Sequence, residues 1–502
     1  MASNDWVLGI DLGTTNTAAV AYGPDRPTPL SILHGRHSPV LPSIVSFKNP
    51  ALPLVGWLAK DMLLTDPLTT IYGWKRFIGR SERSEYVERH RGRFPFRIHE
   101  DHDQMLGAVV HGQVVSFEVV ARLVLDQVRR QAAAALRADV RRCVISVPAH
   151  FGKAQRDAVQ RAGLAAGLQV LRLVNEPTAA SIAFAMNQQL ESRALVFDLG
   201  GGTFDATVLE LVDNIFDVKA SDGESFLGGI DFDRAVLEHL IRHCLHKHKV
   251  DVTEEPIVAQ RLLNAAEAAK CHLSTQEQTR IHVPMVGHDR RGRSFDLDLT
   301  MTRQDLEQLT APLVERCIGI VERTIEQAGL RVSELDHVVV IGGQSRMPLV
   351  RKRIEDALGA TALTHLNPDT CVAHGAALVA RSESDLSGAV LLDVVSVPIG
   401  VVFPGGSTRF VFDRNDALPA RRRVPLPVPQ AGQGMTVGLW QGIDVTSSDR
   451  QVLGILHVPG HHFRAGSDFA LEVNLDEQLN LDLSFVSTVQ RVPLKLNPAR
   501  VA

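Results

Sequence analysis

Two short stretches, GIDLGTT at Gly9–Thr15 and FDLGGGT at Phe197–Thr203, repeat one pattern and set the architecture expected of the chain. Each copy consists of an apolar strand that ends in an aspartate, a glycine-rich turn and a second strand. Glycine lets the backbone turn tightly, so that successive N–H groups point into a concavity that suits phosphate oxygens. A repeat at the scale of a domain predicts two similar lobes that face each other and share a ligand between their turns.

The acids of the two turns predict a metal ion. Asp11 and Asp198 stand at strand ends beside the expected phosphates. A carboxylate next to a phosphate is repelled unless a cation intervenes, and Mg²⁺ held largely through water is the natural bridge. A single turn of this kind most often only reverses the chain, and the prediction depends on there being two copies.

A third glycine-rich turn supports a nucleotide as the ligand. Gly342 and Gly343 follow the apolar run Val338–Ile341 and would let the backbone approach a sugar or a base closely. The sequence contains neither a Walker loop nor a Rossmann Gly-x-Gly-x-x-Gly. We therefore expect two hairpins, rather than one helix N-terminus, to cradle the nucleotide.

The first three quarters of the chain alternate apolar strands with amphipathic helices, which is typical of an α/β fold. Strands are predicted at Val7–Ile10, Cys143–Val147, Ala194–Phe197 and Val338–Ile341. Helices are predicted at Phe117–Ala135, Lys153–Ala166, Glu176–Met186 and Phe232–Lys247, with a further one beginning near Met347.

The texture of the sequence changes after about Ala380. The polar segment Arg381–Gly388 leads into a compact apolar run at Val390–Leu392. Beyond Val394 helix signals vanish, and short alternating segments such as Phe469–Leu475 and Leu479–Val486 predict a small all-β domain. We expect a nucleotide-binding domain at residues 1–384, a linker at 385–394 and a β-sandwich at 395–502.

Length and composition bound the class of protein. At 502 residues, with 45% hydrophobic and 22% charged residues, the chain is expected to form more than one globular domain. The net charge of −4 argues against a nucleic-acid partner, and the run Arg421–Arg423 is interpreted as a solvated surface. Neither a secretory signal nor a membrane-spanning run is evident, and five scattered cysteines without a Cys-x-x-Cys pair favour a reducing cytoplasm.

Seven segments closely resemble the ATPase domain of the 70-kDa heat-shock, or DnaK-like, chaperones: Gly9–Asn16, Val144–Gly163, Arg172–Ala180, Phe197–Asp205, Gly223–Asp233, Val339–Pro348 and Asn367–Ala380. They follow one another in order over roughly residues 6 to 382. The resemblance implies a two-lobed, actin-like ATPase domain that binds ATP or ADP with Mg²⁺. It also implies a following β-sandwich that binds unfolded or extended peptide segments, and hence an ATP-dependent chaperone.

The resemblance assigns catalytic roles to Lys75, Glu176, Asp198, Thr203 and Asp205. The lysine matches the family residue that reaches the γ-phosphate and the attacking water, and the glutamate matches the acid near the metal ion. Thr203 and Asp205 match residues that order the water and the phosphate. Taken without the family, Lys75 would be an ordinary solvated lysine and Glu176 an acid that favours a helix dipole.

The matching nucleotide-binding set is longer. Separately, Asp11 and Asp198 match the metal ligands, which act mostly through water. Glu267, Lys270 and Ser274 lie on one expected helical face and match positions that flank adenosine, although such a spacing is also typical of a surface pair. The whole set is Asp11, Gly13, Thr14, Thr15, Gly200, Gly201, Gly202, Thr203, Glu267, Lys270, Ser274, Gly342, Gly343, Ser345 and Arg346.

Two positions depart from the family pattern near its relay residues, Pro148 and Arg156. His150 stands where an aromatic hydroxyl residue is usual, and because a lone histidine is more often structural, no chemistry is assigned to it. Ile230 replaces an acid that is common after the glycine pair Gly228–Gly229.

Partners follow from the resemblance as well. Val390–Asp393 matches the linker that docks on the ATPase domain when ATP is bound, and its alternative is a slightly hydrophobic tether. Arg172, Asn175 and Asp393 match positions that meet J-domain co-chaperones. The resemblance also allows a nucleotide exchange factor.

The C-terminal part resembles the family's peptide-binding sandwich more loosely. Ile399, Gly400, Val401, Met435 and Val437 fall where family residues line the cleft, but such alternation is equally typical of plain sandwich core. Only a short tail follows Val486, so the helical lid of the family is expected to be absent and any bound peptide to exchange quickly.

Two other function classes fit an actin-like fold. A small-molecule kinase would need an acceptor pocket and an acid placed for a hydroxyl group, whereas the linker and the β-domain fit hydrolysis coupled to binding. A filament-forming or scaffold protein would use the β-domain as an interaction module, and sedimentation with ATP would reveal it.

Overall fold

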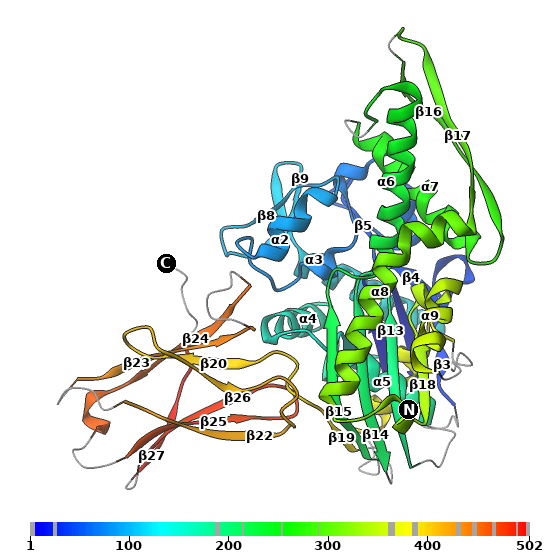
Figure 1. The fold of residues 1–502 in the computed structure, drawn as a ribbon. Helices are drawn as coiled ribbons and strands as arrows, with labels where there is room; N and C mark the ends of the chain where they lie inside the picture. The colour runs from blue at the N-terminus through cyan, green and yellow to red at the C-terminus, as the bar shows by residue number, and fades with distance from the viewer. Residues whose placement is uncertain are drawn as a thin grey trace.

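The computed structural model describes residues 6–23, 28–185, 191–212, 215–252, 255–289, 291–359, 367–383, 390–427, 433–443, 449–463, 468–487 and 490–497. Of the positions named above, the predicted helix end Met186 and the linker residues 385–389 lie outside this part of the chain. The described residues form a mixed α/β protein with several sheets, as the sequence predicts (Figure 1).

The first large sheet carries the first glycine-rich turn. Its strands run in the order β12-β11-β1-β2-β3, and β4 also pairs with β2. Strands β1 and β2 form an antiparallel hairpin around that turn, while β1, β11 and β12 are parallel. The bounds are β1 Val7–Leu12, β2 Asn16–Tyr22, β3 Leu30–Ser31, β4 Val40–Pro42, β11 Arg142–Val147 and β12 Gln169–Asn175.

The second large sheet repeats this arrangement around the second turn. Its order is β18-β13-β14-β15-β19, with β13 and β14 as an antiparallel hairpin and β18 parallel to β13. The bounds are β13 Ser192–Leu199, β14 Phe204–Val212, β15 Ile215–Glu224, β18 His337–Ile341 and β19 Val390–Leu392. The repeat predicted from the sequence is therefore present in the fold: each copy is an antiparallel hairpin with a parallel strand beside its first strand.

Each sheet has its own apolar core. Helices α3 Phe117–Leu136 and α4 Lys153–Ala165 contribute to the core of the first sheet. The core of the second is completed by α6 Gly229–His248, α7 Pro256–Leu273, α8 Arg303–Gln327 and α9 Pro348–Leu358. The long hairpin of β16 Gln278–His288 and β17 Ser294–Thr302 extends beside α6 and α7, away from the C-terminal strands (Figure 1).

A third core joins the two sheets. Helices α5 Glu176–Ala185 and α10 Cys371–Ser382 supply residues to it, together with strands from both sheets. Gly375 on α10 lies directly against the backbone of Ala179 on α5, and Gly9 lies against Ala377, so that any side chain at either glycine would clash with backbone. This close packing fixes the two glycine-rich turns relative to each other.

Smaller elements surround the first sheet. They are β5 Val45–Ser46, β6 Leu54–Val55, β7 Thr70–Ile71, β8 Ile98–Glu100, β9 Leu106–Val110 and β10 Gln113–Ser116. The same region contains two short α-helices and four 3-10 helices: α1 Trp57–Met62, α2 Glu85–His90, η1 Gly35–His37, η2 Pro67–Thr69, η3 Trp74–Arg76 and η4 Arg91–Arg93. Two further 3-10 helices, η5 Val332–Glu334 and η6 Gly343–Arg346, flank β18.

The C-terminal strands form two antiparallel sheets that share one apolar core, and we call them the C-terminal sheet pair. The first has the order β21-β20-β23-β24 and the second β22-β25-β26-β27. The bounds are β20 Ile399–Val402, β21 Thr408–Phe412, β22 Ala420–Pro425, β23 Met435–Gln441, β24 Gln451–Val458, β25 Phe469–Leu475, β26 Leu481–Ser487 and β27 Arg491–Leu494, with η7 Gly460–His462 between β24 and β25.

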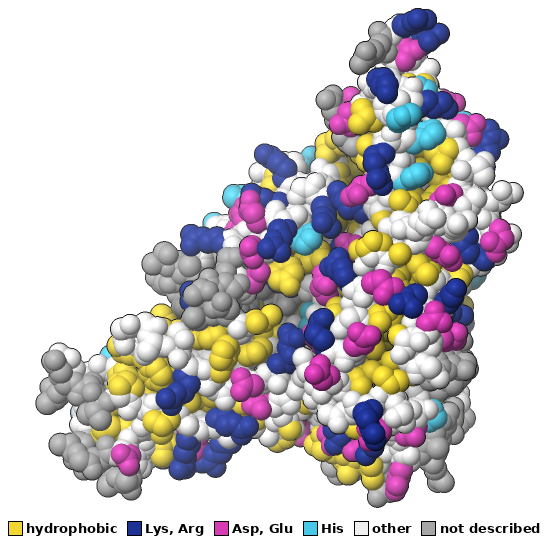
Figure 2. Space-filling view, viewed as in Figure 1, with side chains coloured by type: hydrophobic (Ala, Val, Ile, Leu, Met, Phe, Trp, Pro, Cys, Tyr) yellow, Lys and Arg dark blue, Asp and Glu magenta, His cyan; other side chains and the backbone are white. Residues whose placement is uncertain are grey.

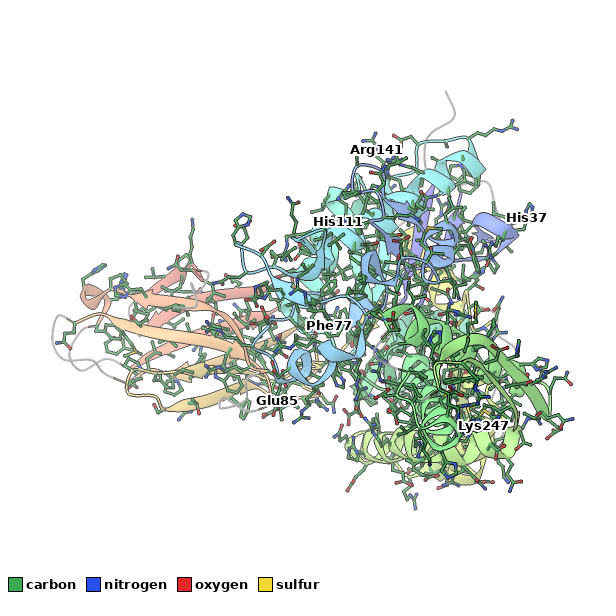
Figure 3. All side chains as sticks on the ribbon, turned by 90° about the horizontal axis from the view of Figure 1, so that it is seen from above. His37, Phe77, Glu85, His111, Arg141 and Lys247 are labelled. Atoms are coloured by element: carbon green, nitrogen blue, oxygen red, sulfur yellow. The ribbon has the colours of Figure 1, made fainter. Side chains whose placement is uncertain are left out.

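The C-terminal sheet pair lies beside α4 and α2. Seen from above, the region of Glu85 lies next to it, whereas Lys247 at the end of α6 lies far from it (Figure 3). Ser84 and the backbone N–H of Tyr86 both bond to the Asp449 carboxylate of the sheet pair. The two parts of the molecule are therefore in direct contact.

The predicted elements agree with the structure to within a few residues. The expected strand Leu479–Val486 begins instead at Leu481, because Leu479 adopts a left-handed φ of 64° in the preceding turn. All five cysteines are free, and all but Cys271 are buried. Among the described residues, no helix has the length and apolar character needed to cross a bilayer.

Candidate active site

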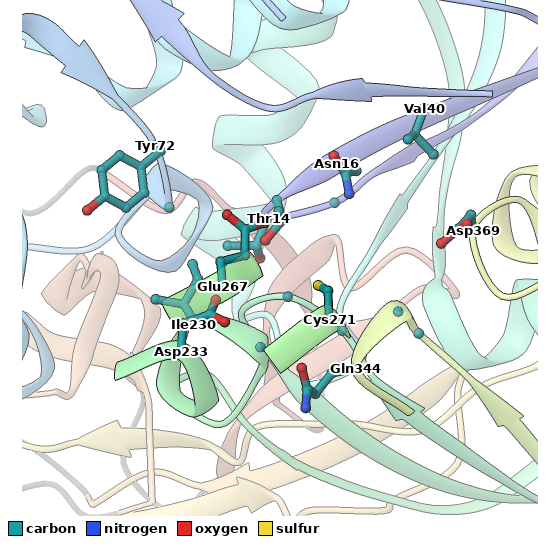
Figure 4. Close-up of a pocket in the computed structure, with 18 of the residues that line it drawn as sticks. Thr14, Asn16, Val40, Tyr72, Ile230, Asp233, Glu267, Cys271, Gln344 and Asp369 are labelled. Atoms are coloured by element: carbon teal, nitrogen blue, oxygen red, sulfur yellow. The ribbon is translucent and has the colours of Figure 1, made fainter. Parts of the chain in front are cut away.

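Most of the predicted site residues line one cavity of about 550 Å³ between the two hairpin turns (Figure 4). This volume is typical of small-molecule sites. The predicted residues in its lining are Asp11, Gly13, Thr14, Thr15, Lys75, Glu176, Asp198, Gly200, Gly201, Thr203, Glu267, Lys270, Ser274, Gly342, Gly343 and Arg346. Residues far apart in the sequence are thus brought together as the repeat predicts.

Three predicted residues lie behind this lining. Gly202 accepts a hydrogen bond at its carbonyl from Arg76 Nε at 2.9 Å, and Ser345 Oγ donates to Gly342 O at 2.6 Å. Asp205 is paired in register with Asp198 across the hairpin. The first two shape their turns rather than face the cavity.

The two hairpin turns interlock. A side chain at Gly201 would run into the side chain of Thr15, and one at Gly202 would run into Thr14. Glycine is therefore required in the second turn because the first turn occupies the space. The backbone groups of both turns face one shared volume.

Lys75 is not a solvated lysine. It lies in η3 with only 1% of its surface exposed, and its Nζ donates to Glu176 Oε1 at 2.6 Å. Glu176 begins α5, so it also stands at a helix start, as the simpler interpretation of that acid required. The pair projects into the cavity that both hairpin turns line.

Burial and mutual repulsion perturb the acids around this pair. Burial raises the pKa of Glu176 to about 7, against the lowering effect of Lys75 and with further raising by Asp11 and Asp205. Burial likewise raises the pKa of Asp11 and, more strongly, that of Asp198, where neighbouring carboxylates add to the effect. Ionising these groups together is unfavourable without added positive charge.

That excess of negative charge fits a divalent cation. The carboxylate oxygens of Asp11 and Asp198 are the hard ligands that Mg²⁺ takes, and both residues line the cavity beside the hairpin turns. The donor set therefore suits a hydrated metal ion.

The opposite end of the cavity is built on α7. Lys270 is buried and its Nζ lies 2.8 Å from Asp233 Oδ1, so its interpretation as a surface residue is wrong. Glu267 meets Lys60 Nζ of α1 at 3.4 Å, which connects the two sides of the cavity. Ser274 lies just after the helix, where its Oγ donates to Lys270 O at 3.0 Å.

Several lining residues were not predicted. Asn264 and Cys271 precede and follow Glu267 by three and four positions on α7, so the helical spacing used for Lys270 would also have found them. Lys60, Tyr72 and Asp233 carry no such signal. Burial raises the pKa of Asp233 to about 6, against the lowering effect of Lys270.

The two departures from the family pattern both fall at the site. Ile230 lines the cavity and places an apolar side chain in it (Figure 4). His150 is nearly buried, with Nδ1 2.8 Å from Asp205 Oδ1 and Nε2 2.7 Å from Ser225 Oγ. A histidine to which the sequence assigned no chemistry therefore contacts one of the five predicted catalytic residues.

A chain of contacts leads from the cavity to the linker. Lys75 Nζ lies 5.7 Å from the centre of the Phe151 ring, and Phe151 O accepts from Arg156 Nε at 3.2 Å. Arg156 also donates to Asn175, whose Nδ2 donates to Asp393 Oδ2 at 2.6 Å. The predicted relay residue Arg156 thus stands between the site and the linker.

The linker is docked. Strand β19 pairs with the edge strand β15, and Leu391 is only 7% exposed. The three residues predicted to meet a J-domain, Arg172, Asn175 and Asp393, line one small cleft at this junction. Arg172 is also paired with Glu477 of the C-terminal sheet pair.

The C-terminal sheet pair buries the residues that might have lined a cleft. Ile399, Val401, Met435 and Val437 all belong to its shared core, which agrees with the core interpretation of these positions. Hydrophobic side chains also gather on its surface (Figure 2), where Phe410, Val452 and Ile455 are exposed.

The arginine run on this sheet pair is more than a solvated surface. Arg421 and Arg423 both donate to the Glu472 carboxylate, and Arg491 contacts it from β27, two strands away from β25 in the same sheet. The Glu472 side chain is fully buried beneath these partly exposed arginines. A buried carboxylate requires such compensation, which a charge run in the sequence does not reveal.

Facing glycine-rich turns, clustered acids and a buried lysine–glutamate pair define the chain as a nucleotide-binding protein of the hydrolase type. Residues 7–476 match the family model described as Hsp70 protein, and the chain belongs to this family. Over 478 residues it is 36% identical to the Chaperone protein DnaK of Deinococcus deserti and 35% identical to that of Deinococcus proteolyticus. Each alignment covers 94% of this chain and 75% of the relative.

Proposed function

We propose that binding and hydrolysis of Mg-ATP in the hairpin cavity modulate the binding of extended peptide segments by the C-terminal sheet pair. The chain is an ATP-dependent molecular chaperone of the Hsp70 family, and its enzymatic activity is ATP hydrolysis. The observation that carries the coupling is the run of contacts from Lys75 through Phe151, Arg156 and Asn175 to Asp393 of the docked linker. The kinase and filament alternatives are not favoured by this membership.

The proposed domains are a two-lobed, actin-like ATPase domain at residues 1–384, a linker at 385–394 and a β-sandwich at 395–502. Two large sheets with the same hairpin and parallel neighbour, each with its own core, support the two lobes. Two antiparallel sheets around one core support the sandwich.

We assign the phosphates of ATP or ADP to the two hairpin turns. The backbone N–H groups of Gly13, Thr14 and Thr15 and of Gly201–Thr203 would donate to phosphate oxygens. The Gly200 N–H instead donates to Thr203 O at 3.0 Å and closes the second turn. Asp11 and Asp198 would hold Mg²⁺, mostly through water. The ion, when bound, neutralises phosphate charge and polarises the group that is transferred.

Lys75 would stabilise the charge that develops on the γ-phosphate during hydrolysis, because a buried cation acts strongly in a low dielectric. Glu176 holds the lysine by its 2.6 Å contact. Thr203 and Asp205 would orient the attacking water. Adenosine would lie on the α7 side of the cavity, against Glu267, Lys270, Ser274, Gly342, Gly343 and Arg346. Ser345 would support this part of the site from behind by its bond to Gly342 O.

The proposed macromolecular partners are unfolded or extended peptides, a J-domain co-chaperone and a nucleotide exchange factor. The J-domain surface would include Arg172, Asn175 and Asp393, which lie together at the linker junction. The free cysteines are consistent with the reducing cytoplasm that we propose as the location.

The function is tested by fluorescence anisotropy of a labelled apolar peptide in ATP and in ADP. We expect weaker or faster-exchanging peptide binding in ATP. In Lys75→Ala, calorimetry should still detect ATP binding, while the hydrolysis rate falls by about 10²-fold or more, since a transition-state donor is lost.

Lys48→Ala is the matched control, because Lys48 is an exposed lysine paired with Asp66 on the surface. It should hydrolyse ATP and respond to nucleotide as the wild type does. Peptide binding that is identical in ATP and ADP would contradict the chaperone cycle, and the absence of ATP binding by the folded wild type would contradict the proposed site itself.

A further inference from the structure

A hydrogen-bonded row of three side chains lies behind the proposed catalytic site. His150 follows β11, Asp205 stands near the start of β14, and Ser225 follows β15. The imidazole lies between the other two, 2.8 Å from Asp205 Oδ1 through Nδ1 and 2.7 Å from Ser225 Oγ through Nε2. Nearly all of the imidazole is removed from solvent, and Asp205 is 1% exposed.

Donor and acceptor chemistry fixes the direction of these bonds. An ionised carboxylate only accepts, so the proton on the imidazole lies on Nδ1 and is donated to Asp205. Ser225 Oγ accepts from Arg80 Nη2 at 3.1 Å, which leaves its own hydrogen for His150 Nε2. The neutral ring is thus satisfied at both nitrogens.

The second oxygen of Asp205 has a different environment. Oδ2 is buried and, among the described residues, has no hydrogen-bond partner. Asp205 stands opposite Asp198, which lines the cavity. A buried carboxylate oxygen without a partner is costly unless water or another donor reaches it.

We propose that His150 is a positioning residue for ATP hydrolysis, which holds Oδ1 of Asp205 so that Oδ2 remains to accept a hydrogen bond from the attacking water. This inference rests on the proposed role of Asp205 in orienting that water. His150 itself acts only through Asp205, since it is not among the residues that line the cavity at the hairpin turns.

The same three residue types also build acyl-transfer sites, in which the serine is a nucleophile. Ser225 does not suit that chemistry. It is 4% exposed, its oxygen is already bonded to Arg80, and it is not part of the lining of the hairpin cavity. Ser225 therefore holds His150 in place by its hydrogen bond to Nε2, and His150 does not activate Ser225 as a nucleophile.

The test compares two amide variants in single-turnover hydrolysis. His150→Asn places an amide N–H near the position of Nδ1 and therefore keeps the contact with Asp205. The longer side chain of His150→Gln places its amide near the position of Nε2 and therefore loses that contact. We expect the hydrolysis rate of His150→Gln to fall about tenfold, which corresponds to the loss of one well-placed hydrogen bond. The rate of His150→Asn should stay within about threefold of the wild-type rate. ATP affinity by calorimetry should change less than about twofold in both.

Rescue by the conservative variant separates positioning from a merely structural role. His150→Asn offers a donor to Asp205 Oδ1, whereas a structural defect would slow both amide variants alike. Ser225→Ala keeps the imidazole and its contact with Asp205, so its rate should stay within about threefold of the wild-type rate.

The proposal is overturned if His150→Gln is as active as the wild type, or if His150→Asn is no faster than His150→Gln. Loss of ATP binding in an amide variant would mark a folding defect. In that case Ser225→Ala decides, because a rate near that of the wild type supports the proposal and a fall as large as that expected of His150→Gln contradicts it. Failure of the wild type to bind or hydrolyse ATP would instead reject the proposed function, and this inference with it.

Discussion

At Glu176, several opposing electrostatic effects meet on one carboxyl group. Burial and the nearby acids Asp11 and Asp205 favour the protonated form, and Lys75 at 2.6 Å favours the ionised one. Burial prevails and raises the pKa to about 7. In the nucleotide-free protein, this carboxyl group therefore gains or loses its proton near neutral pH.

A pH-dependent stability follows from that shift. An acid with a raised pKa in the folded state contributes stability below its unfolded pKa and loses it as pH rises through the folded value. For Glu176 the window runs from about 4.5 to about 7, and the loss is about 3 kcal/mol. Glu176→Gln, which mimics the protonated form, should therefore gain in Tm over the nucleotide-free wild type as pH rises from 5 to about 8.

Measuring the difference in Tm between the two proteins removes the contribution of other titrating groups. The buried His34 and the partly buried His374, whose pKa values burial lowers, act in the opposite direction in both proteins. Glu322→Gln, an exposed glutamate on α8, is the matched control and should show a constant difference. If the difference in Tm between Glu176→Gln and the wild type is also constant with pH, the pKa of Glu176 is not raised.

Single residues differ in how far the sequence predicts them. The paired turns indicated that Asp11 and Asp198 would lie together, and the family resemblance added Lys75 and Glu176. The contacts of His150 were missed because its partners lie elsewhere in the chain, Asp205 on β14 and Ser225 just after β15, and no local pattern connects them. A contact that exists only after folding leaves no spacing to detect.

Among the elements, strand β19 shows why a short apolar run is ambiguous in sequence. Val390–Leu392 becomes a strand because β15 offers it an unpaired edge. Longer elements such as α3 and β13 were predicted because their own periodicity determines them. A three-residue strand depends on its neighbour, so the sequence allowed either a docked segment or a loose tether.

Docking of this strand is testable with two adjacent positions. Leu391 is buried against β15, whereas Val390 is 51% exposed. Leu391→Asp loses about 2 kcal/mol of apolar burial and adds a charge to an apolar site, so amide hydrogen exchange at residues 390–392 should accelerate at least tenfold. Val390→Asp is the matched control and should exchange almost as the wild type does. Equal protection in both variants would mean that the side chain of Leu391 does not hold the strand.

At the scale of the whole molecule, the start of α4 is capped by the C-terminal sheet pair. Gly152, at the N-cap position, has no side chain with which to accept a bond. Gln441 Oε1 accepts from Lys153 N at 2.7 Å, and Gln451 Oε1 accepts from Ala154 N at 3.1 Å. Two free N–H groups of the helix are thus satisfied from another part of the chain.

Removing both caps should loosen the contact between the parts. Each cap is worth about 1 kcal/mol, so Gln441→Ala with Gln451→Ala should lower the docked-to-undocked ratio by a factor of about 30. Small-angle X-ray scattering in ATP should then report a larger radius of gyration.

Gln478→Ala, on an exposed turn of the same sheet pair, should leave the radius unchanged. An unchanged radius in the double variant would show that other contacts, such as Arg414 with Asp222, suffice to hold the parts together. The sequence predicted a docking linker but not these glutamines, because capping in trans leaves no local signature.

The interlocked turns bear on how such a gene diverges. Thr15 fills the space that a side chain at Gly201 would need, and Thr14 does the same for Gly202. A substitution in one turn is therefore tolerated only with a compensating substitution in the other, and accepted mutations in the two turns should occur in pairs. A library that randomises one turn at a time would yield mostly inactive clones, whereas one that varies both at once would sample the few viable combinations.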